Sequence, residues 1–265
     1  MTAILNLAGK VAVITGAASG IGRQTATLFH ALGARLLLTD IDADGLAAFA
    51  AELGGDVLTA THDVTSEEAW HAVFGQVDAA FGRLDILVNN AGIMVSKPFA
   101  DAGIEVLRRQ MAINVEGIYM GMRGALPLMR AAVAAGGATT SIVNISSVYG
   151  KVGGAQFAAY SATKGAVRGL GKAVAIELAG TGIRVNTVLP GPVATNLGAS
   201  WDPPTDADGH PLTPEAALAA WTTLIPMGRL GEATDIAPLI AFLASDAAAF
   251  ITGSEFIADG GYTAA

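Results

Sequence analysis

Short runs of β-branched and other hydrophobic residues alternate along this chain with longer stretches whose apolar residues recur at helical spacing. Runs that are apolar at nearly every position are typical of strands buried on both faces, as in a parallel sheet covered by helices. These runs predict strands at residues 11–15, 34–40, 56–63, 84–90, 141–147, 183–190 and 254–260. The helical stretches predict helices at residues 20–32, 44–53, 66–81, 102–114, 115–135, 160–180 and 233–244.

The alternation continues to the last strand without a linker, so residues 1–265 are interpreted as one domain. Its predicted fold class is α/β, a Rossmann-type doubly wound parallel sheet of about seven strands with helices on both faces. Residues 191–223 break the pattern, since they are rich in Pro, Asp and Gly with only scattered apolar residues. An irregular stretch this long in a compact domain is typically a functional lid or a disordered segment.

The composition of the chain limits the kinds of molecule that such a domain could bind. Hydrophobic residues make up 52% of the chain and charged residues only 14%, which is enough apolar material for a sizeable core. The formal charge of −8 argues against binding to nucleic acid or to an anionic membrane, because both attract clustered Lys and Arg. The chain has no cysteine, so disulfides and thiolate chemistry are excluded, and no metal cluster is readable. Neither a membrane-spanning run nor a signal peptide is recognised, so we expect a cytoplasmic protein.

A glycine-rich turn follows the first predicted strand. Residues 15–22 read TGAASGIG and lead into the first predicted helix. Glycines let a backbone turn tightly and approach a pyrophosphate, while the helix N-terminus offers free N–H groups and the positive end of its dipole. The position between strand and helix favours a dinucleotide site over a simple turn.

Asp40, at the end of the second predicted strand, indicates which dinucleotide binds. An acidic residue at this point, about 20 residues after the glycine turn, is placed to accept hydrogen bonds from the adenosine ribose. It would also repel the 2′-phosphate of NADP, and no Lys or Arg follows closely to offset that repulsion. The alternative is a solvated Asp that opens a turn. The sequence predicts NAD.

Tyr160 and Lys164, in the sequence YSATK, are four residues apart on a predicted helix and so share one face. An ordinary tyrosine has a pKa near 10 and is a poor base at neutral pH. A neighbouring ammonium, and the positive ring of an oxidised nicotinamide, would lower the pKa of Tyr160 and make the pair a proton-transfer unit for an alcohol. Taken alone, the pair is also compatible with a surface Tyr over a solvated Lys.

These motifs occur together with others in a fixed order. Over essentially its whole length the chain resembles the short-chain dehydrogenase/reductase family, nearest to NAD-dependent secondary-alcohol and hydroxysteroid dehydrogenases. The matching landmarks are TGAASGIG (15–22), Asp40, Asp63-Val64, NNAG (89–92), Asn114, NISS (144–147), YSATK (160–164) and PGPVAT (190–195). No catalytic position departs from the family pattern.

The resemblance implies a role for each catalytic residue. Ser147 would hydrogen-bond the substrate oxygen, with Ser146 as the alternative if the register differs by one. Tyr160 would be the general acid or base, and Lys164 would bind the nicotinamide ribose and tune Tyr160. Asn114 would hold a water of the proton relay, or alternatively cap or kink its helix.

The resemblance also implies the residues around the cofactor. Asn89, the first residue of NNAG, is interpreted as organising the sheet and not as contacting the cofactor. The cofactor-binding residues are predicted to be Gly16, Ser19, Gly20, Ile21, Gly22, Asp40, Asp63, Val64, Asn90, Ala91, Gly92, Tyr160, Lys164, Pro190, Gly191, Val193 and Thr195.

Residues 191–223 are then expected to form a lid over the substrate, which would be a small molecule. Residues 185–228 contain no Lys or Arg, so an apolar, uncharged secondary alcohol or ketone fits best, whether cyclic, aryl or steroid-like. The alternative is that the apolar residues pack the lid or a subunit contact. The substrate pocket is predicted from Met94, Ser147, Val148, Val152, Gln156, Phe157, Tyr160, Leu197 and Trp201.

Three other functions compete with this interpretation. A β-ketoacyl reductase of lipid synthesis is weakened by Asp40 and by the absence of basic docking residues on the lid. An enoyl reductase would place Tyr and Lys farther apart, and a non-catalytic NAD-sensing protein would be expected to lose a catalytic residue. The resemblance further implies a homotetramer, with the small residues at 158, 162, 165, 166, 169 and 173 permitting close helix packing.

Overall fold

A parallel sheet forms the centre of the molecule. The computed structural model describes residues 5–55, 57–136, 139–195, 197, 210 and 212–264. Within them the sheet has seven strands, all parallel, in the order β3-β2-β1-β4-β5-β6-β7. The strands are β1 (Val11–Thr15), β2 (Arg35–Asp40), β3 (Leu58–Thr61), β4 (Ile86–Asn89), β5 (Thr140–Ile145), β6 (Ile183–Pro190) and β7 (Glu255–Ala258). The predicted fold class is confirmed.

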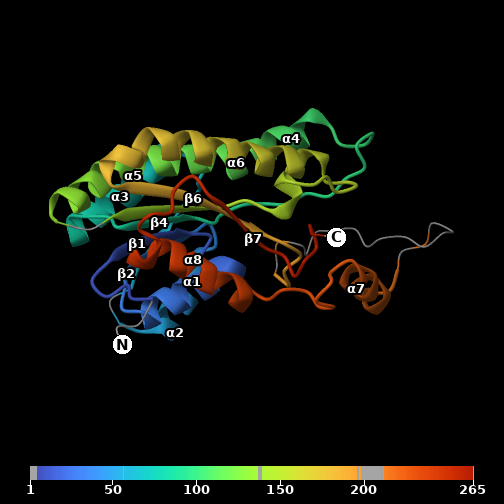
Figure 1. Cartoon of the computed structure of the whole chain (residues 1–265), viewed down its shortest axis with the longest axis horizontal. Helices are drawn as coiled ribbons and strands as arrows, with labels where there is room; N and C mark the ends of the chain where they lie inside the picture. Colours follow the sequence, from blue (N-terminus) through green and yellow to red (C-terminus); the bar gives the residue numbers. More distant parts are fainter. Residues whose placement is uncertain are drawn as a thin grey trace.

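Helices cover both faces of this sheet (Figure 1). One face carries α1 (Gly20–Ala31), α2 (Ala43–Leu53) and α8 (Ala233–Ala244), and the other carries α3 (Glu67–Phe81), α5 (Gly117–Ala134) and α6 (Ala158–Leu178). Successive residues of β1 serve opposite faces: Ala12 and Ile14 pack with α1 and α8, while Val11 and Val13 pack with α3, α5 and α6. Both sets are fully buried, which explains why the sequence of β1 is an almost continuous apolar run.

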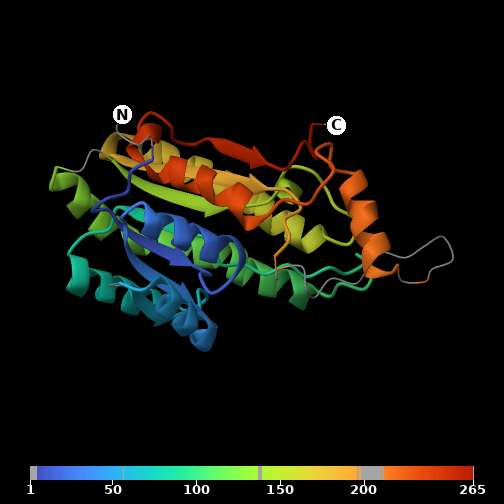
Figure 2. The ribbon, with the colours of Figure 1, turned by 90° about the horizontal axis from the view of Figure 1, so that it is seen from below.

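Two segments differ from the sequence prediction. The helices expected at 102–114 and 115–135 form one continuous run, in which α4 (Ile104–Met111) passes through a π-helical turn, η1 (Ala112–Glu116), into α5. The predicted irregular stretch 191–223 ends in a helix, α7 (Pro214–Thr223), whose N-terminus is capped by Thr213. In Figure 2, α7 lies beyond the end of the sheet toward which the strands point.

Candidate active site

A cleft opens where β1 and β4, which are neighbours in the sheet, send their connections to opposite faces. In sheets of this kind ligands bind at such a switch point, outside the carboxyl ends of the strands. Two adjoining cavities lie here, of about 490 Å³ and 410 Å³. We call the first the glycine-turn groove and the second the Tyr160 cavity. They share Ile21, Met94, Thr195 and Leu197, so they form one continuous cleft.

The glycine turn is packed so tightly that side chains would not fit. Gly16 and Gly20 have φ values of +66° and +54°, which favour glycine. A Cβ on Gly22 would lie 2.1 Å from the carbonyl oxygen of Gly16, so Gly22 serves the packing of the turn and does not line the groove. Ser19 precedes α1, but its side chain does not cap the helix. The first N–H groups of α1 therefore donate no hydrogen bond to the Ser19 hydroxyl.

The end of β4 holds this turn in place. The Asn90 side chain donates to the carbonyl oxygens of Thr15 (2.9 Å) and Gly16 (3.1 Å). The backbone N–H groups of Asn90 and Ala91 both donate to the Thr15 hydroxyl at 3.0 Å. Asn89, by contrast, donates to the Asn144 side chain on β5 at 2.8 Å, and it lines neither cavity.

Two acidic residues face the groove at the ends of β2 and β3. The Asp40 carboxylate accepts the Ala18 N–H of the glycine turn at 2.9 Å, so it is fixed beside the groove. Asp63 accepts two hydrogen bonds from Thr65, and these lower its pKa. Val64, which is buried, completes this wall.

His62, beside Asp63, is a buried residue whose protonation opposes folding. Its Nδ1 lies 3.1 Å from the Thr39 hydroxyl, its ring packs edge-on against Trp70, and its Nε2 has no partner in the described part of the chain. Burial lowers the pKa of His62 from 6.5 to about 4, although Asp63 acts in the opposite direction. Between these two pH values the unfolded chain binds more protons than the folded one, so the protein becomes less stable as the pH is lowered through this window.

We therefore expect the free energy of unfolding to fall by about 2 kcal/mol between pH 7 and pH 5 through His62 alone. Urea unfolding of the wild type and of His62→Gln at both pH values measures it. The variant should be less sensitive to pH by about that amount. Equal pH sensitivity of the two proteins would show that His62 is not the group responsible.

The second half of the cleft is built around Tyr160. This residue and Lys164 lie in α6 with 4% and 3% exposure, so both are enclosed and neither is a solvated surface group. Ser147 follows β5 and forms a hydrogen bond with the Tyr160 hydroxyl that lowers the pKa of the phenol. Ser146 points elsewhere, because its hydroxyl donates to the carbonyl oxygen of Lys164 at 2.8 Å. The structure therefore places Ser147, and not Ser146, beside Tyr160.

Burial shifts the pKa values of both Tyr160 and Lys164. For Tyr160 the direction is opposite to the one predicted from the sequence. Burial raises the pKa of Tyr160 to about 12, which outweighs the effect of Ser147, and lowers that of Lys164 to about 8. Lys164 Nζ donates to the carbonyl oxygen of Ile145 at 2.8 Å and lies 5.7 Å from the centroid of the Tyr160 ring. Burial thus outweighs the lowering of the Tyr160 pKa expected from neighbouring groups, and Tyr160 keeps its proton at neutral pH.

Asn114 lies at the centre of the π-helical turn and is fully buried. Its side chain accepts the Ile93 N–H at 2.8 Å, donates to the Ile93 carbonyl at 2.9 Å, and donates to the Thr163 hydroxyl at 3.1 Å. It therefore ties the segment after β4 to α6, one residue away from Lys164. π-helical turns are frequent at functional sites.

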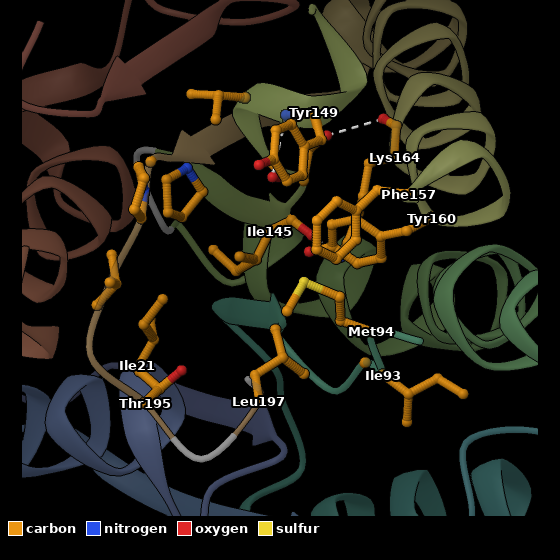
Figure 3. Close-up of a pocket in the computed structure, with 18 of the residues that line it drawn as sticks. Ile21, Ile93, Met94, Ile145, Tyr149, Phe157, Tyr160, Lys164, Thr195 and Leu197 are labelled. Atoms are coloured by element: carbon orange, nitrogen blue, oxygen red, sulfur yellow. Dashed lines mark hydrogen bonds between the residues drawn. The ribbon is translucent and has the colours of Figure 1, made fainter. Parts of the chain in front are cut away.

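Most of the predicted pocket residues meet around Tyr160 (Figure 3). Leu197, Thr195 and Ile21 lie across the cavity from the Tyr160 ring. Val152 and Gln156 do not line it; the Gln156 side chain accepts a hydrogen bond from Ser96. Trp201 lies outside the described residues. The predicted residues that do line the cavity are Met94, Ser147, Val148, Phe157, Tyr160 and Leu197, together with Asn90, Gly92, Lys164, Pro190, Gly191, Val193 and Thr195.

The cavity also has walls that the sequence prediction missed. They include Ile93, Ile145, Tyr149 and Leu230, whereas Pro192, Ala194 and Trp221 come from the predicted lid. Tyr149 stacks on Phe157 with ring centroids 5.0 Å apart and meets Tyr160 edge-on at 6.5 Å. Among the described lining residues Lys164 is the only charged side chain, so the cavity is apolar and aromatic around one hydroxyl pair.

Comparison with known proteins agrees with this geometry. A family model described as enoyl-(acyl carrier protein) reductase matches residues 16–263. The crystal structure of a short-chain type dehydrogenase/reductase from Mycobacterium marinum has a TM-score of 0.87 at 33% identity, covering 99% of this chain and 98% of that one. The chain belongs to the short-chain dehydrogenase/reductase family.

Curated relatives of this short-chain dehydrogenase/reductase are alcohol dehydrogenases. The NADP-dependent (R)-specific alcohol dehydrogenase of Lentilactobacillus kefiri is 39% identical over 262 residues, which is 97% of this chain and 98% of that enzyme. The cyclopentanol dehydrogenase of Comamonas testosteroni is 39% identical over 259 residues, which is 96% of this chain and 97% of that enzyme.

Short-chain dehydrogenase/reductases use a nicotinamide cofactor, and the glycine-turn groove fits one. Its closely packed turn leaves room for a ligand's phosphates beside the N-terminus of α1, where N–H groups and the helix dipole favour anions. The groove is lined by Gly16, Ser19, Gly20, Ile21, Asp40, Asp63, Val64, Asn90, Ala91, Gly92 and Thr195, all predicted from the sequence to contact the cofactor.

Proposed function

We propose that this short-chain dehydrogenase/reductase uses NAD to interconvert a neutral, cyclic secondary alcohol and its ketone. One observation carries the proposal: Ser147 and Tyr160 face each other in an apolar cavity that joins the glycine-turn groove. A hydroxyl pair in that place is suited to an oxygen that gains or loses a proton.

In this proposal the cofactor supplies or accepts the hydride, and the protein positions the substrate and handles the proton. Ser147 holds the substrate oxygen next to the Tyr160 hydroxyl. Tyr160, which its raised pKa keeps protonated, donates its proton in ketone reduction and accepts one in alcohol oxidation. Oxidation therefore requires positive charge nearby, which Lys164 and an oxidised nicotinamide ring would contribute. Asn114 would hold a water that continues the proton path from Lys164 to solvent.

Asp40 supports NAD over NADP. Its carboxylate is held at the groove wall by the Ala18 N–H, where it would accept hydrogen bonds from a ribose hydroxyl and repel a phosphate. The Lentilactobacillus relative is described as NADP-dependent, so the preference has to be carried by residues of this chain such as Asp40.

The lining of the Tyr160 cavity supports a neutral substrate. Phe157 and Tyr149 offer flat aromatic faces, and no cation other than Lys164 is among the described lining residues. Residues 185–228, which include the proposed lid 191–223, contain no Lys or Arg. A substrate carboxylate or phosphate would have to enter this cavity without a counter-charge, which is unfavourable. The cyclopentanol dehydrogenase relative agrees with a small ring.

A comparison of matched alcohols tests the substrate class. With NAD, cyclohexanol is expected to be oxidised with a kcat/KM at least about 10-fold higher than 4-hydroxycyclohexanecarboxylate, because the cavity offers no partner for the carboxylate. The rate of reduced-cofactor formation is measured for both. A clear preference for the carboxylate would contradict the neutral-substrate proposal while leaving the alcohol chemistry intact.

The remaining proposals concern the assembly and its location. We propose a homotetramer, which is supported by the small residues Ala158, Ala162, Gly169 and Ala173 on the exposed face of α6, next to exposed Ile176. The mass in solution measures this directly. A cytoplasmic location stays a prediction from the sequence. None of the helices in the described ranges is long and apolar enough to cross a bilayer.

A further inference from the structure

An arginine outside every recognised motif lines the glycine-turn groove. Asp40 and Asp63 place two negative charges on the groove wall, and Arg109, on α4, is the only Lys or Arg among its described lining residues. A dinucleotide brings two further negative charges on its pyrophosphate. The groove would therefore be unfavourable for its ligand if no positive charge balanced the two carboxylates.

Arg109 lies on the face of α4 that lines the groove. Ile113, one turn further along, lines the same groove, so this face of α4 and η1 is directed into it. Gln110, the next residue, is fully buried and accepts the Val95 N–H at 3.1 Å, which fixes α4 against the segment after β4.

The guanidinium of Arg109 has no competing role in the described structure. The residue is exposed, and its side chain makes no hydrogen bond or ion pair with another described residue. Other arginines are engaged: Arg168 binds Glu255, and Arg229 binds Asp235. An unengaged arginine on the wall of a groove for an anionic ligand is suited to a phosphate, which a guanidinium can bind through two N–H groups.

We propose that Arg109 is a cofactor-binding residue that contacts the pyrophosphate of the dinucleotide. It approaches from the α4 side, whereas the glycine turn and the N-terminus of α1 approach from the β1 side. This inference rests on the nicotinamide cofactor of the proposed function.

The chain offers a matched control in Arg108, which is also exposed, carries the same charge and does not line the groove. Dissociation constants for NADH, and for adenosine in competition with it, are measured by cofactor fluorescence for wild type, Arg109→Gln, Arg109→Lys and Arg108→Gln. Arg109→Gln should weaken NADH binding about 10-fold and leave adenosine unchanged, while Arg108→Gln should change neither. Arg109→Lys should recover part of the loss, and added salt should weaken wild-type binding more than that of Arg109→Gln.

Three outcomes would overturn the proposal. Equal NADH affinity in Arg109→Gln and wild type would show that the guanidinium makes no contact, with the proposed function intact. An equal loss for adenosine and NADH would place the contact at the base or ribose and not at the pyrophosphate. Failure of the wild type itself to bind NADH or NADPH would reject the proposed cofactor, and with it the role of Arg109.

Discussion

Replacing Tyr160 with phenylalanine is expected to lower kcat for cyclohexanol oxidation by about 10² to 10⁴-fold, which is the usual contribution of positioned proton transfer. The substitution removes only the hydroxyl, and the ring keeps its place in the buried wall beside Phe157 and Tyr149. NADH affinity should therefore stay within about twofold of wild type. Steady-state kinetics and a fluorescence titration measure the two quantities separately.

Tyr149→Phe is the matched control, because Tyr149 lines the same cavity and loses the same hydroxyl. That hydroxyl bonds to Tyr262 near the C-terminus and has no place in the proton transfer proposed for Tyr160. Its loss should change kcat by less than about tenfold. A Tyr160→Phe protein that keeps most of the wild-type kcat would remove Tyr160 from the proton-transfer role.

Replacing Asp40 with asparagine should reduce the preference for NAD over NADP by about 100-fold, measured as the ratio of kcat/KM for the two cofactors. Asparagine keeps a side-chain oxygen that accepts the Ala18 N–H, so the glycine turn retains its support. It removes the charge, whose repulsion of a 2′-phosphate about 4 Å away is worth up to several kcal/mol at the edge of a protein. Most of the change should come from improved use of NADP.

Asp44→Asn controls for the general loss of one negative charge, because Asp44 is exposed on α2 and does not line the groove. Its cofactor ratio should equal that of the wild type. If Asp40→Asn and Asp44→Asn shift the ratio equally, the preference depends on net charge and not on the position of Asp40. A wild type that already prefers NADP would contradict the cofactor proposal directly.

The strands could be predicted because the sheet is covered on both faces, so most strand positions are apolar. The glycine turn and Asp40 could be placed relative to each other for a related reason, since parallel strands end at the same edge. The N-terminus of α7 was also readable, because Thr213 followed by proline is a helix start signal, but the surrounding Pro, Asp and Gly residues obscured it.

Other features depend on contacts that no local pattern contains. The π-helical turn around Asn114 is a change of hydrogen-bond register inside a continuous helix, and hydrophobic spacing does not reveal it. Gln156 adopts a φ of +69° and its side chain bonds to Ser96, so it does not line the pocket. Tyr149, in the turn after Ser147, lines the pocket instead. The direction of the Tyr160 pKa shift follows from how deeply the fold buries the phenol.

The most direct test of the account is the initial rate of reduced-cofactor formation from cyclohexanol with NAD or NADP, with the ketone product quantified in parallel. The account predicts equal amounts of reduced cofactor and ketone, a higher kcat/KM with NAD, and loss of both products in Tyr160→Phe. Turnover with NADP alone would contradict the role of Asp40. Absence of turnover with cyclohexanol, cyclopentanol and aryl or steroid alcohols, in a protein that binds NADH, would contradict the proposed reaction.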